Sequence, residues 1–152
     1  MLQKFILFSL LFLMPALSYA EVSEKINLKK MWVRATIGQA TTGVLYGILE
    51  NKTGKDDALI AVSTPASRMS MIHRTSMNNE GIMSMSHMEK VVLKDDTYVA
   101  MEPGDIHVML MGLEQKLTAG YEIPVKFEFE NSPAQNIRVK IYPLSTKWKD
   151  VE

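Results

Sequence analysis

The sequence YEIPVKFEFE, residues 121–130, most clearly decides the fold class of this chain. Apolar and charged side chains alternate along it with the two-residue period of a β-strand that has one buried face. The apolar positions that we expect to be buried are Ile123, Val125, Phe127 and Phe129. Pro124 has no N–H to donate, so it indicates either that the strand begins at a sheet edge or that pairing starts after it.

Segments on either side of this strand repeat the pattern in shorter form, separated by turn residues. We expect strands at residues 26–35, 41–50, 58–63, 67–75, 83–87, 91–93, 98–101, 107–111 and 137–141. No long segment has the period of a helix. Only residues 113–119 would form a helical turn, and residues 145–152 are predicted to be a polar tail. Many short strands between regular turns predict one all-β domain, a sandwich or a barrel.

The first twenty residues have the features of a secretory signal peptide. Lys4 precedes an apolar run at residues 5–13, and Pro15 and the small residues of the Ser18-Tyr19-Ala20 sequence follow it. The run is shorter than the roughly 20 residues that span a bilayer. An uncleaved amphipathic anchor is the alternative, but the run has no polar face. We therefore expect residues 1–20 to be removed and residues 21–152 to form the exported domain.

Charge and cysteine content narrow the function classes further. The chain has 17 basic and 17 acidic residues and no block of like charge, which argues against a nucleic-acid partner. No later segment is apolar and long enough to cross a membrane, so we expect no stable membrane insertion. Cysteine is absent, so neither disulfides nor thiolate ligands are available.

Histidine and methionine are concentrated in one part of the chain. All three histidines lie there, at positions 73, 87 and 107. Nine of the twelve methionines lie there as well: Met69, Met71, Met77, Met83, Met85, Met88, Met101, Met109 and Met111. Imidazole and thioether groups without thiolate form a soft, uncharged ligand set, which suits Cu(I) better than zinc, calcium or magnesium.

Strand spacing can bring some of these side chains to one ion. Residues two apart on a strand lie roughly 6.5 Å apart on one face, as His107 and Met109 would. A hairpin turn at residues 78–81 would bring Met85 close to His73. Taken singly, a methionine in a strand usually fills the core, and a lone histidine is more often a hydrogen-bonded boundary residue. The joint pattern favours a metal site, but the spacing alone leaves core packing open.

The same residues carry a family resemblance. The chain resembles the periplasmic copper chaperones of the PCu(A)C type, whose pattern is His, usually Met, ten residues, Met, twenty-one residues and His-x-Met. This sequence has His73, Arg74, ten residues, Met85, twenty-one residues and then His107-Val108-Met109. The sequence GDIHVMLMGL, residues 104–113, also resembles the signature strand of that family.

Two features near this motif are unusual. Arg74 stands where the optional methionine of the family would be, and strand alternation points it away from the site, so we expect no ligand role for it. His87 and Met88 follow Met85 closely and are candidate auxiliary metal ligands, with exposed hairpin residues as the plainer interpretation.

The resemblance implies a cupredoxin-like β-sandwich of Greek-key type. It implies Cu(I) binding by His73, Met85, His107 and Met109, and transfer of the ion by ligand exchange in the periplasm. The implied acceptor is a respiratory copper protein, above all the binuclear copper site of cytochrome c oxidase, with a thioredoxin-like copper protein as a second partner.

Three other functions are weaker on the sequence. An electron-transfer cupredoxin needs a cysteine thiolate at its blue-copper site, and this chain has none. No serine–histidine–acid set or carboxylate pair stands out, so we expect neither catalytic residues nor enzyme activity. A secreted β-sandwich with a binding or structural role, whose methionines only pack, is the alternative that stays open.

Overall fold

The computed structural model describes residues 25–151, and the predicted signal peptide lies outside them. Within this described range, ten strands and one short 3-10 helix follow in chain order. Their bounds are β1 Ile26–Arg34, β2 Thr42–Asn51, β3 Asp57–Ser63, β4 Ser67–Met77, β5 Met83–His87, β6 Val91–Leu93, β7 Tyr98–Met101, β8 Ile106–Leu113, β9 Glu122–Phe129, β10 Gln135–Tyr142 and η1 Trp148–Asp150. Each expected strand is present, with its ends shifted by at most a few residues.

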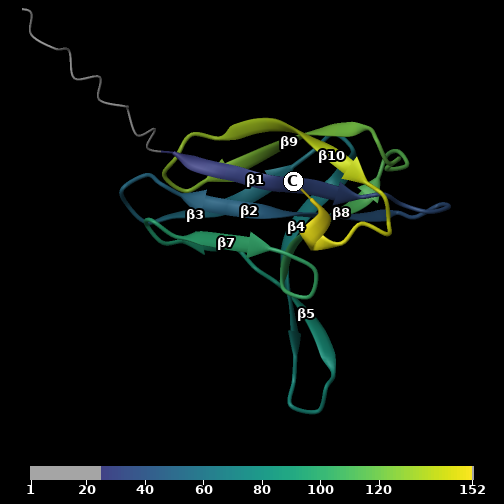
Figure 1. Ribbon diagram of the computed structural model, residues 1–152, viewed down its shortest axis with the longest axis horizontal. Coiled ribbons are helices and arrows are strands. Elements are labelled where there is room, and N and C mark those ends of the chain that lie inside the picture. Colours follow the sequence, from purple (N-terminus) through teal and green to yellow (C-terminus); the bar gives the residue numbers. More distant parts are fainter. Residues whose placement is uncertain (1–24, 152) are drawn as a thin grey trace, which may run out of the picture.

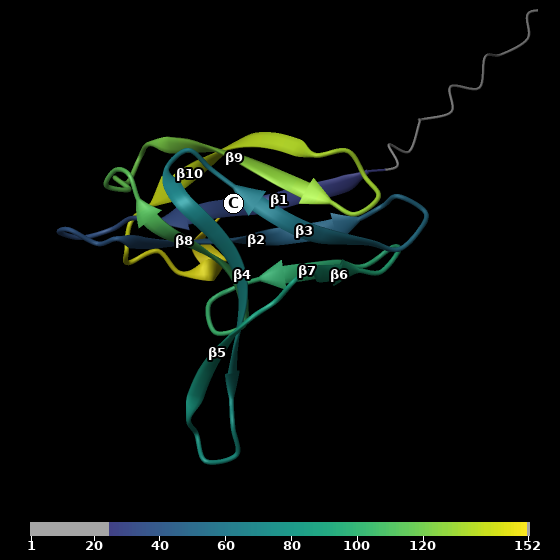
Figure 2. The ribbon, with the colours of Figure 1, turned by 180° about the vertical axis from the view of Figure 1, so that it is seen from behind.

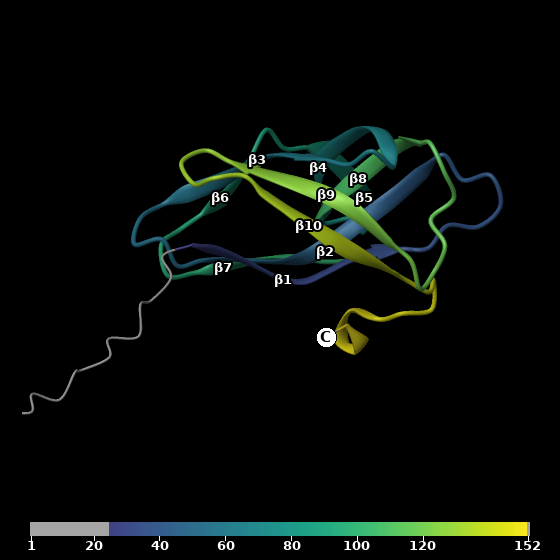
Figure 3. The same ribbon diagram turned by 90° about the horizontal axis from the view of Figure 1, so that it is seen from above.

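The strands form one hydrogen-bonded sheet that folds over on itself. Its order is β5-β4-β8-β2-β1-β10-β9-β3-β6, and β7 pairs separately with β2. β1 and β10 run parallel, and the other pairs are antiparallel. In Figure 3, β9 passes in front of β2, and residues of both strands belong to one buried cluster, so the sheet makes two packed layers. The prediction of an all-β sandwich is confirmed.

The core lies between these two layers. The apolar face of β9 is buried as predicted, with Phe127 fully covered, and it packs in one cluster with Leu45 of β2 and Val108 of β8. Pro124 pairs only with Arg138 of β10, because β3 meets β9 further along the strand, from Lys126 onward. On the β3 side, pairing therefore starts after the proline, which is the second of the two interpretations that its missing N–H allowed.

Two local expectations were wrong. Residues 113–119 form no helical turn, because Leu117 is drawn fully into the core and its N–H bonds the hydroxyl of Thr36. The tail is not simply polar either, since η1 lies in it and Val151 is buried against Trp32 in a second, smaller cluster. Tertiary burial of single apolar residues outweighed the local pattern in both places.

A hairpin of β4 and β5 projects from the sandwich. Figures 1 and 2 show the far half of β4 and all of β5 standing clear of the other strands. Up to Arg74, β4 pairs with β8, and beyond that residue it pairs only with β5. All five residues of β5 are exposed. We call residues 75–87 the arm and the rest of the described chain the body. No helix in residues 25–151 has the length and hydropathy of a membrane span.

Candidate metal centre

The three histidines stand side by side on three neighbouring strands. His73 of β4 lies directly opposite His107 of β8 on one side and opposite His87 of β5 on the other. The ring centroids are 6.2 Å apart for His73 and His107, and 5.8 Å apart for His73 and His87. Residues directly opposite one another on antiparallel strands share a face of the sheet. The register therefore gathers three imidazoles that are 14 and 20 residues apart in sequence into one row.

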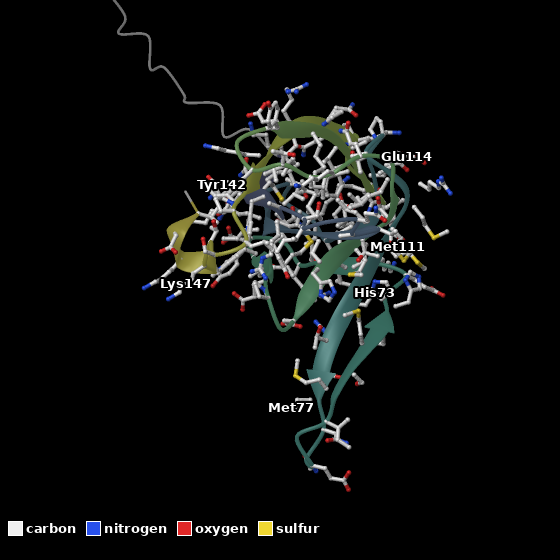
Figure 4. The ribbon with its side chains drawn as sticks, turned by 90° about the vertical axis from the view of Figure 1, so that its right-hand side faces the viewer. His73, Met77, Met111, Glu114, Tyr142 and Lys147 are labelled. Carbon is white, nitrogen blue, oxygen red and sulfur yellow. The ribbon has the colours of Figure 1, made fainter. Side chains whose placement is uncertain are left out.

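Methionines flank this row on the same face. Towards the body, Met71 lies opposite Met109, and Met69 lies opposite Met111. Towards the tip of the arm, Thr75 lies opposite Met85, and the next same-face pair is Met77 and Met83. In Figure 4, His73 lies between Met111 of β8, at the body, and Met77 of β4, on the arm.

The face is the outer side of the sandwich, because the alternate residues of the same strands fill the core. Ile72, Val108 and Leu110 are all buried there. The row continues across the sheet from His107 to Tyr46 of β2, whose ring centroid is 6.4 Å from that of His107, and then to Trp32 of β1, 5.0 Å from Tyr46. Burial raises the pKa of the Tyr46 hydroxyl, and the charge of Arg34 opposes this effect. The Arg34 guanidinium lies over the rings of both Tyr46 and Trp32, so this side of the row is shielded from solvent but carries a positive charge.

His107 is held in one orientation by the turn before β8. It is only 4% exposed, and its Nδ1 lies 2.9 Å from the backbone carbonyl oxygen of Asp105. A carbonyl only accepts, so Nδ1 carries the proton and donates, which leaves the lone pair of the neutral ring on Nε2. The same carbonyl also accepts from the backbone N–H of Thr75, which ties the base of the arm to this turn. Asp105 therefore positions the ring in the way typical of metal-ligating histidines.

His73 lies in the middle of the row and is partly buried. Its Nδ1 is covered and makes no hydrogen bond of ordinary geometry. Burial lowers the pKa of His73, and the neighbouring imidazoles of His107 and His87 lower it further, while the backbone of Met71 acts in the opposite direction. A lowered pKa keeps this ring neutral near pH 7, and neutral imidazole is the form that binds metal.

The structure brings three of the four expected ligands into direct adjacency. His73 faces His107, and Met109 follows His107 on the same face of β8. Met85 is 53% exposed and lies diagonal to His73 across β5, so β4 separates it from His107 and Met109. No group of three or more His, Cys, Asp or Glu side chains in residues 25–151 is arranged to hold a metal ion. The four-ligand set itself stays a prediction.

The two auxiliary candidates, His87 and Met88, lie in different surroundings. His87 is exposed and directly opposite His73, closer in register than Met85 is. Met88 instead packs against the main core, and its N–H bonds the carbonyl of Ile72, so it is not part of the outer row. Arg74 lies on the alternate face of β4, and its Nε donates to the carboxylate of Asp105 at 3.1 Å.

Sequence reasoning missed two contributors to this site. Met71 lies directly opposite Met109 and two residues before His73 on β4, and strand alternation had already put it on the face of His73. The carbonyl of Asp105 left no signal in the side-chain pattern, because a backbone acceptor can come from any residue type. The one available clue was the position of Asp105, two residues before His107 in the turn that precedes β8.

The comparisons with known proteins agree with this architecture. A family model described as "Putative lipoprotein LpqE-like" matches residues 26–141. The chain belongs to the LpqE-like family. It is 27% identical over 114 residues to an uncharacterised protein of Rickettsia prowazekii (strain Madrid E), in a match that covers 72% of this chain and 62% of that protein. It therefore spans less than two thirds of that relative. A protein of Leifsonia xyli subsp. xyli described as a putative lipoprotein is 26% identical over 124 residues, covering 81% of this chain and 73% of that one.

Solved structures show the same fold for this LpqE-like chain. The apo PCuAC domain of PmoF2 matches with a TM-score of 0.67 and 22% identity, over 81% of this chain and 94% of that domain. A copper-bound PCuAC domain of PmoF2 matches with a TM-score of 0.67 and 23% identity, over 78% of this chain and 93% of that domain. The CuI form of DR1885 from Deinococcus radiodurans matches with a TM-score of 0.59 and 20% identity, over 84% of this chain and 86% of that one. The cupredoxin-like sandwich that the resemblance implied is confirmed.

Proposed function

We propose that this protein is a copper chaperone of the periplasm, which binds Cu(I) through His73, His107, Met109 and Met85. The observation that carries the proposal is the pairing of His73 with His107 on one face, beside Met109. The hydrogen bond from His107 to the turn before β8 leaves Nε2 available for the ion. Two imidazoles and two thioethers form a neutral, soft donor set, which favours Cu(I).

The solved relatives support copper as the cargo. One PCuAC domain of PmoF2 is a copper-bound structure, and DR1885 has a structure in the CuI form. Both have the fold of this chain. The His73-to-Met109 motif keeps the spacing that PCu(A)C chaperones use, so the donors that the fold presents are of the type that this cargo needs.

Transfer would proceed by exchange of one ligand at a time. His107 is buried and fixed, whereas Met85 lies on the exposed arm and has a flexible side chain. An incoming donor from an acceptor protein would therefore displace Met85 first, while both imidazoles still hold the ion. Neutral ligands need no proton to leave, which keeps the barrier to release low. No catalytic residue is needed for this role.

For the acceptor, we propose a respiratory copper protein, namely the binuclear copper site of a cytochrome c oxidase subunit, with a thioredoxin-like copper protein as a second partner. Export to the periplasm after removal of residues 1–20 would bring the chain to such acceptors. Mixing the copper-loaded protein with the apo copper domain of an oxidase subunit tests this. Copper should be found on the acceptor after separation, and copper retained wholly on this protein would rule the acceptor out.

The binding proposal is tested by competition for Cu(I) against a chromophoric chelator under anaerobic, reducing conditions. The variants His107→Ala and Met109→Leu should lose affinity. The matched control is Met101→Leu, which changes a fully buried methionine of the core and should leave Cu(I) affinity unchanged. Equal affinity in the His107→Ala and unmodified proteins would contradict the proposal.

The alternative is a secreted β-sandwich whose methionines only pack. That interpretation describes Met31, Met88 and Met101, which belong to or pack against the core. It does not describe the four methionines that are more than half exposed on the outer face: Met69, Met77, Met83 and Met85. Absence of tight Cu(I) binding in the competition experiment would favour this alternative.

A further inference from the structure

Three methionines outside the proposed ligand set form a cluster of their own. Met69 and Met111 lie directly opposite each other on β4 and β8, and Met71 follows Met69 on the same face. We call Met69, Met71 and Met111 the thioether triangle. Figure 4 places Met111 at the body end of the face that also presents His73. The triangle therefore adjoins the proposed site, because Met71 of the triangle lies directly opposite Met109 of that site.

Core packing does not account for the triangle. The buried side of these strands is already filled by Ile72, Val108 and Leu110. Met69 is 54% exposed, and Met71 and Met111 are only half-buried. An exposed thioether in an exported protein is open to oxidation, so it is a liability unless the sulfur has a use.

The geometry suits one soft ion. Directly opposed Cβ atoms lie about 5 Å apart and diagonal ones about 7–8 Å apart, distances that three flexible thioether side chains can close around a single metal. β2 pairs with β8 on its other side, with Thr42 opposite Met111, so the strands that present the triangle are braced.

The surrounding charges do not favour a hard cation. Glu114, the residue after the end of β8, is already paired with Arg68 at 2.7 Å. Three neutral sulfurs without a carboxylate select Cu(I) over calcium, magnesium or zinc.

We propose that Met69, Met71 and Met111 form a second Cu(I) site, made of thioethers only and weaker than the first because it lacks imidazole. It rests on the proposed function and extends it, because a weak site beside a tight one holds copper that is entering or leaving the chaperone. The Met71 and Met109 pair gives the ion a continuous path of sulfur donors between the two sites.

The test is an anaerobic Cu(I) titration of the full chain, labelled with carbon-13 at its methionine methyl groups and followed by NMR. Cu(I) is diamagnetic, so it does not broaden the signals of nearby methyl groups. Coordination of a methionine sulfur shifts the signal of its methyl group, which identifies the bound methionines. The first equivalent should shift Met109 and Met85, and the second should shift the three methyls of the triangle. The double variant Met69→Leu/Met111→Leu should bind one equivalent instead of two, with the first unchanged.

The matched control is Met77→Leu/Met83→Leu, another cross-strand pair on the same face, 67% and 60% exposed. This pair lies on the arm, which no third strand braces, so its loss should leave both equivalents in place. Binding of only one equivalent by the unmodified protein, or loss of the second equivalent in the control instead, would overturn the second site. A different result would contradict the proposed function itself: either the first equivalent of Cu(I) is not bound, or its binding does not depend on His107.

Discussion

The body and the arm carry the same alternation of histidine and methionine, but the two regions place it in different surroundings. In the body, β4 is flanked by β8, and β8 is flanked in turn by β2, so Met71, Met109 and Met111 are partly buried. In the arm, β4 has only β5 beside it, and Met77 and Met83 are largely exposed. The same alternation therefore gives partly buried methionine donors where β4 has β8 beside it. It gives exposed donors where β4 has only β5 beside it.

The proposed site lies at the boundary between these regions. His73 is flanked by His107 on the body side and by His87 on the arm side. A ligand set that is fixed on one side and adjustable on the other can hold an ion and still release it. The predictions that follow separate the two regions by experiment.

The largest difference should be in stability. Leu110→Ala removes a fully buried side chain of the body, and we expect it to lower the free energy of unfolding by about 2–5 kcal/mol. Met77→Ala removes an exposed side chain of the arm and should change it by no more than about 0.5 kcal/mol. Chemical denaturation of both variants measures this. A comparable loss in Met77→Ala would mean that the arm packs against something in solution.

Copper affinity should show the next largest difference. Met109→Leu removes a donor that the body holds in place, and we expect at least a tenfold loss of Cu(I) affinity, about 1.4 kcal/mol. Met85→Leu removes a donor on the exposed arm and should cost less, because its bound position must be ordered at each binding event. Leucine nearly conserves the volume of methionine, so both variants should fold. Competition titrations rank them, and a larger loss in Met85→Leu would reverse the assigned roles of body and arm.

Most of the fold could be predicted from the sequence, because it depends on alternation that each strand carries by itself. β6 and β7 have the predicted bounds, and the buried face of β9 is the predicted one. What failed depended on distant partners. Leu117 and Val151 are single apolar residues in polar surroundings, and only the core and the Trp32 cluster that they meet explain their positions.

For the candidate site, the sequence could suggest the ligands but not the strand register that decides their neighbours. Alternation put the histidines and the methionines of β4, β5 and β8 on one face, yet it did not fix which residue of β5 lies opposite His73. That is decided by the turn at the tip of the arm, where Asn78 accepts backbone hydrogen bonds from Glu80 and Ile82. A shift of two residues along a strand keeps the face and changes the neighbour, so sequence alone could not separate Met85 from His87.

The pH dependence should reveal the shielded position of His73. Burial lowers the pKa of this imidazole, so it stays neutral to a lower pH than the ordinary value of about 6.5. Proton competition should therefore weaken Cu(I) binding only as the pH falls below about 6.5, by up to roughly tenfold per pH unit for each imidazole that must lose a proton. Competition titrations between pH 8 and pH 5 measure this, and a flat response would argue against histidine ligation.

The arm contributes to this profile through His87. Protonated His87 is one of the causes that lower the pKa of His73, so His87→Ala should raise that pKa and move the loss of affinity to higher pH.

The stability of the apo protein gives a second readout of the pKa of His73. Its unfolded chain takes up a proton on His73 at about pH 6.5, before the folded protein does, so stability should fall as the pH drops through that value. His73→Ala should remove this part of the dependence, and an unchanged profile would show that His73 is not its source.

The smallest effect should come from Arg74, at the junction of the arm and the body. Its guanidinium pairs with the carboxylate of Asp105 at 3.1 Å, and both side chains are about half exposed, so Arg74→Ala should cost between 0 and about 1 kcal/mol of stability. Copper affinity should not change, because the backbone carbonyl of Asp105, and not its carboxylate, orients His107. Arg74→Met restores the residue type that PCu(A)C chaperones usually have there and serves as the comparison. Tighter Cu(I) binding by Arg74→Met than by Arg74→Ala would mean that position 74 reaches the ion after all, and that the base of the arm twists when copper binds.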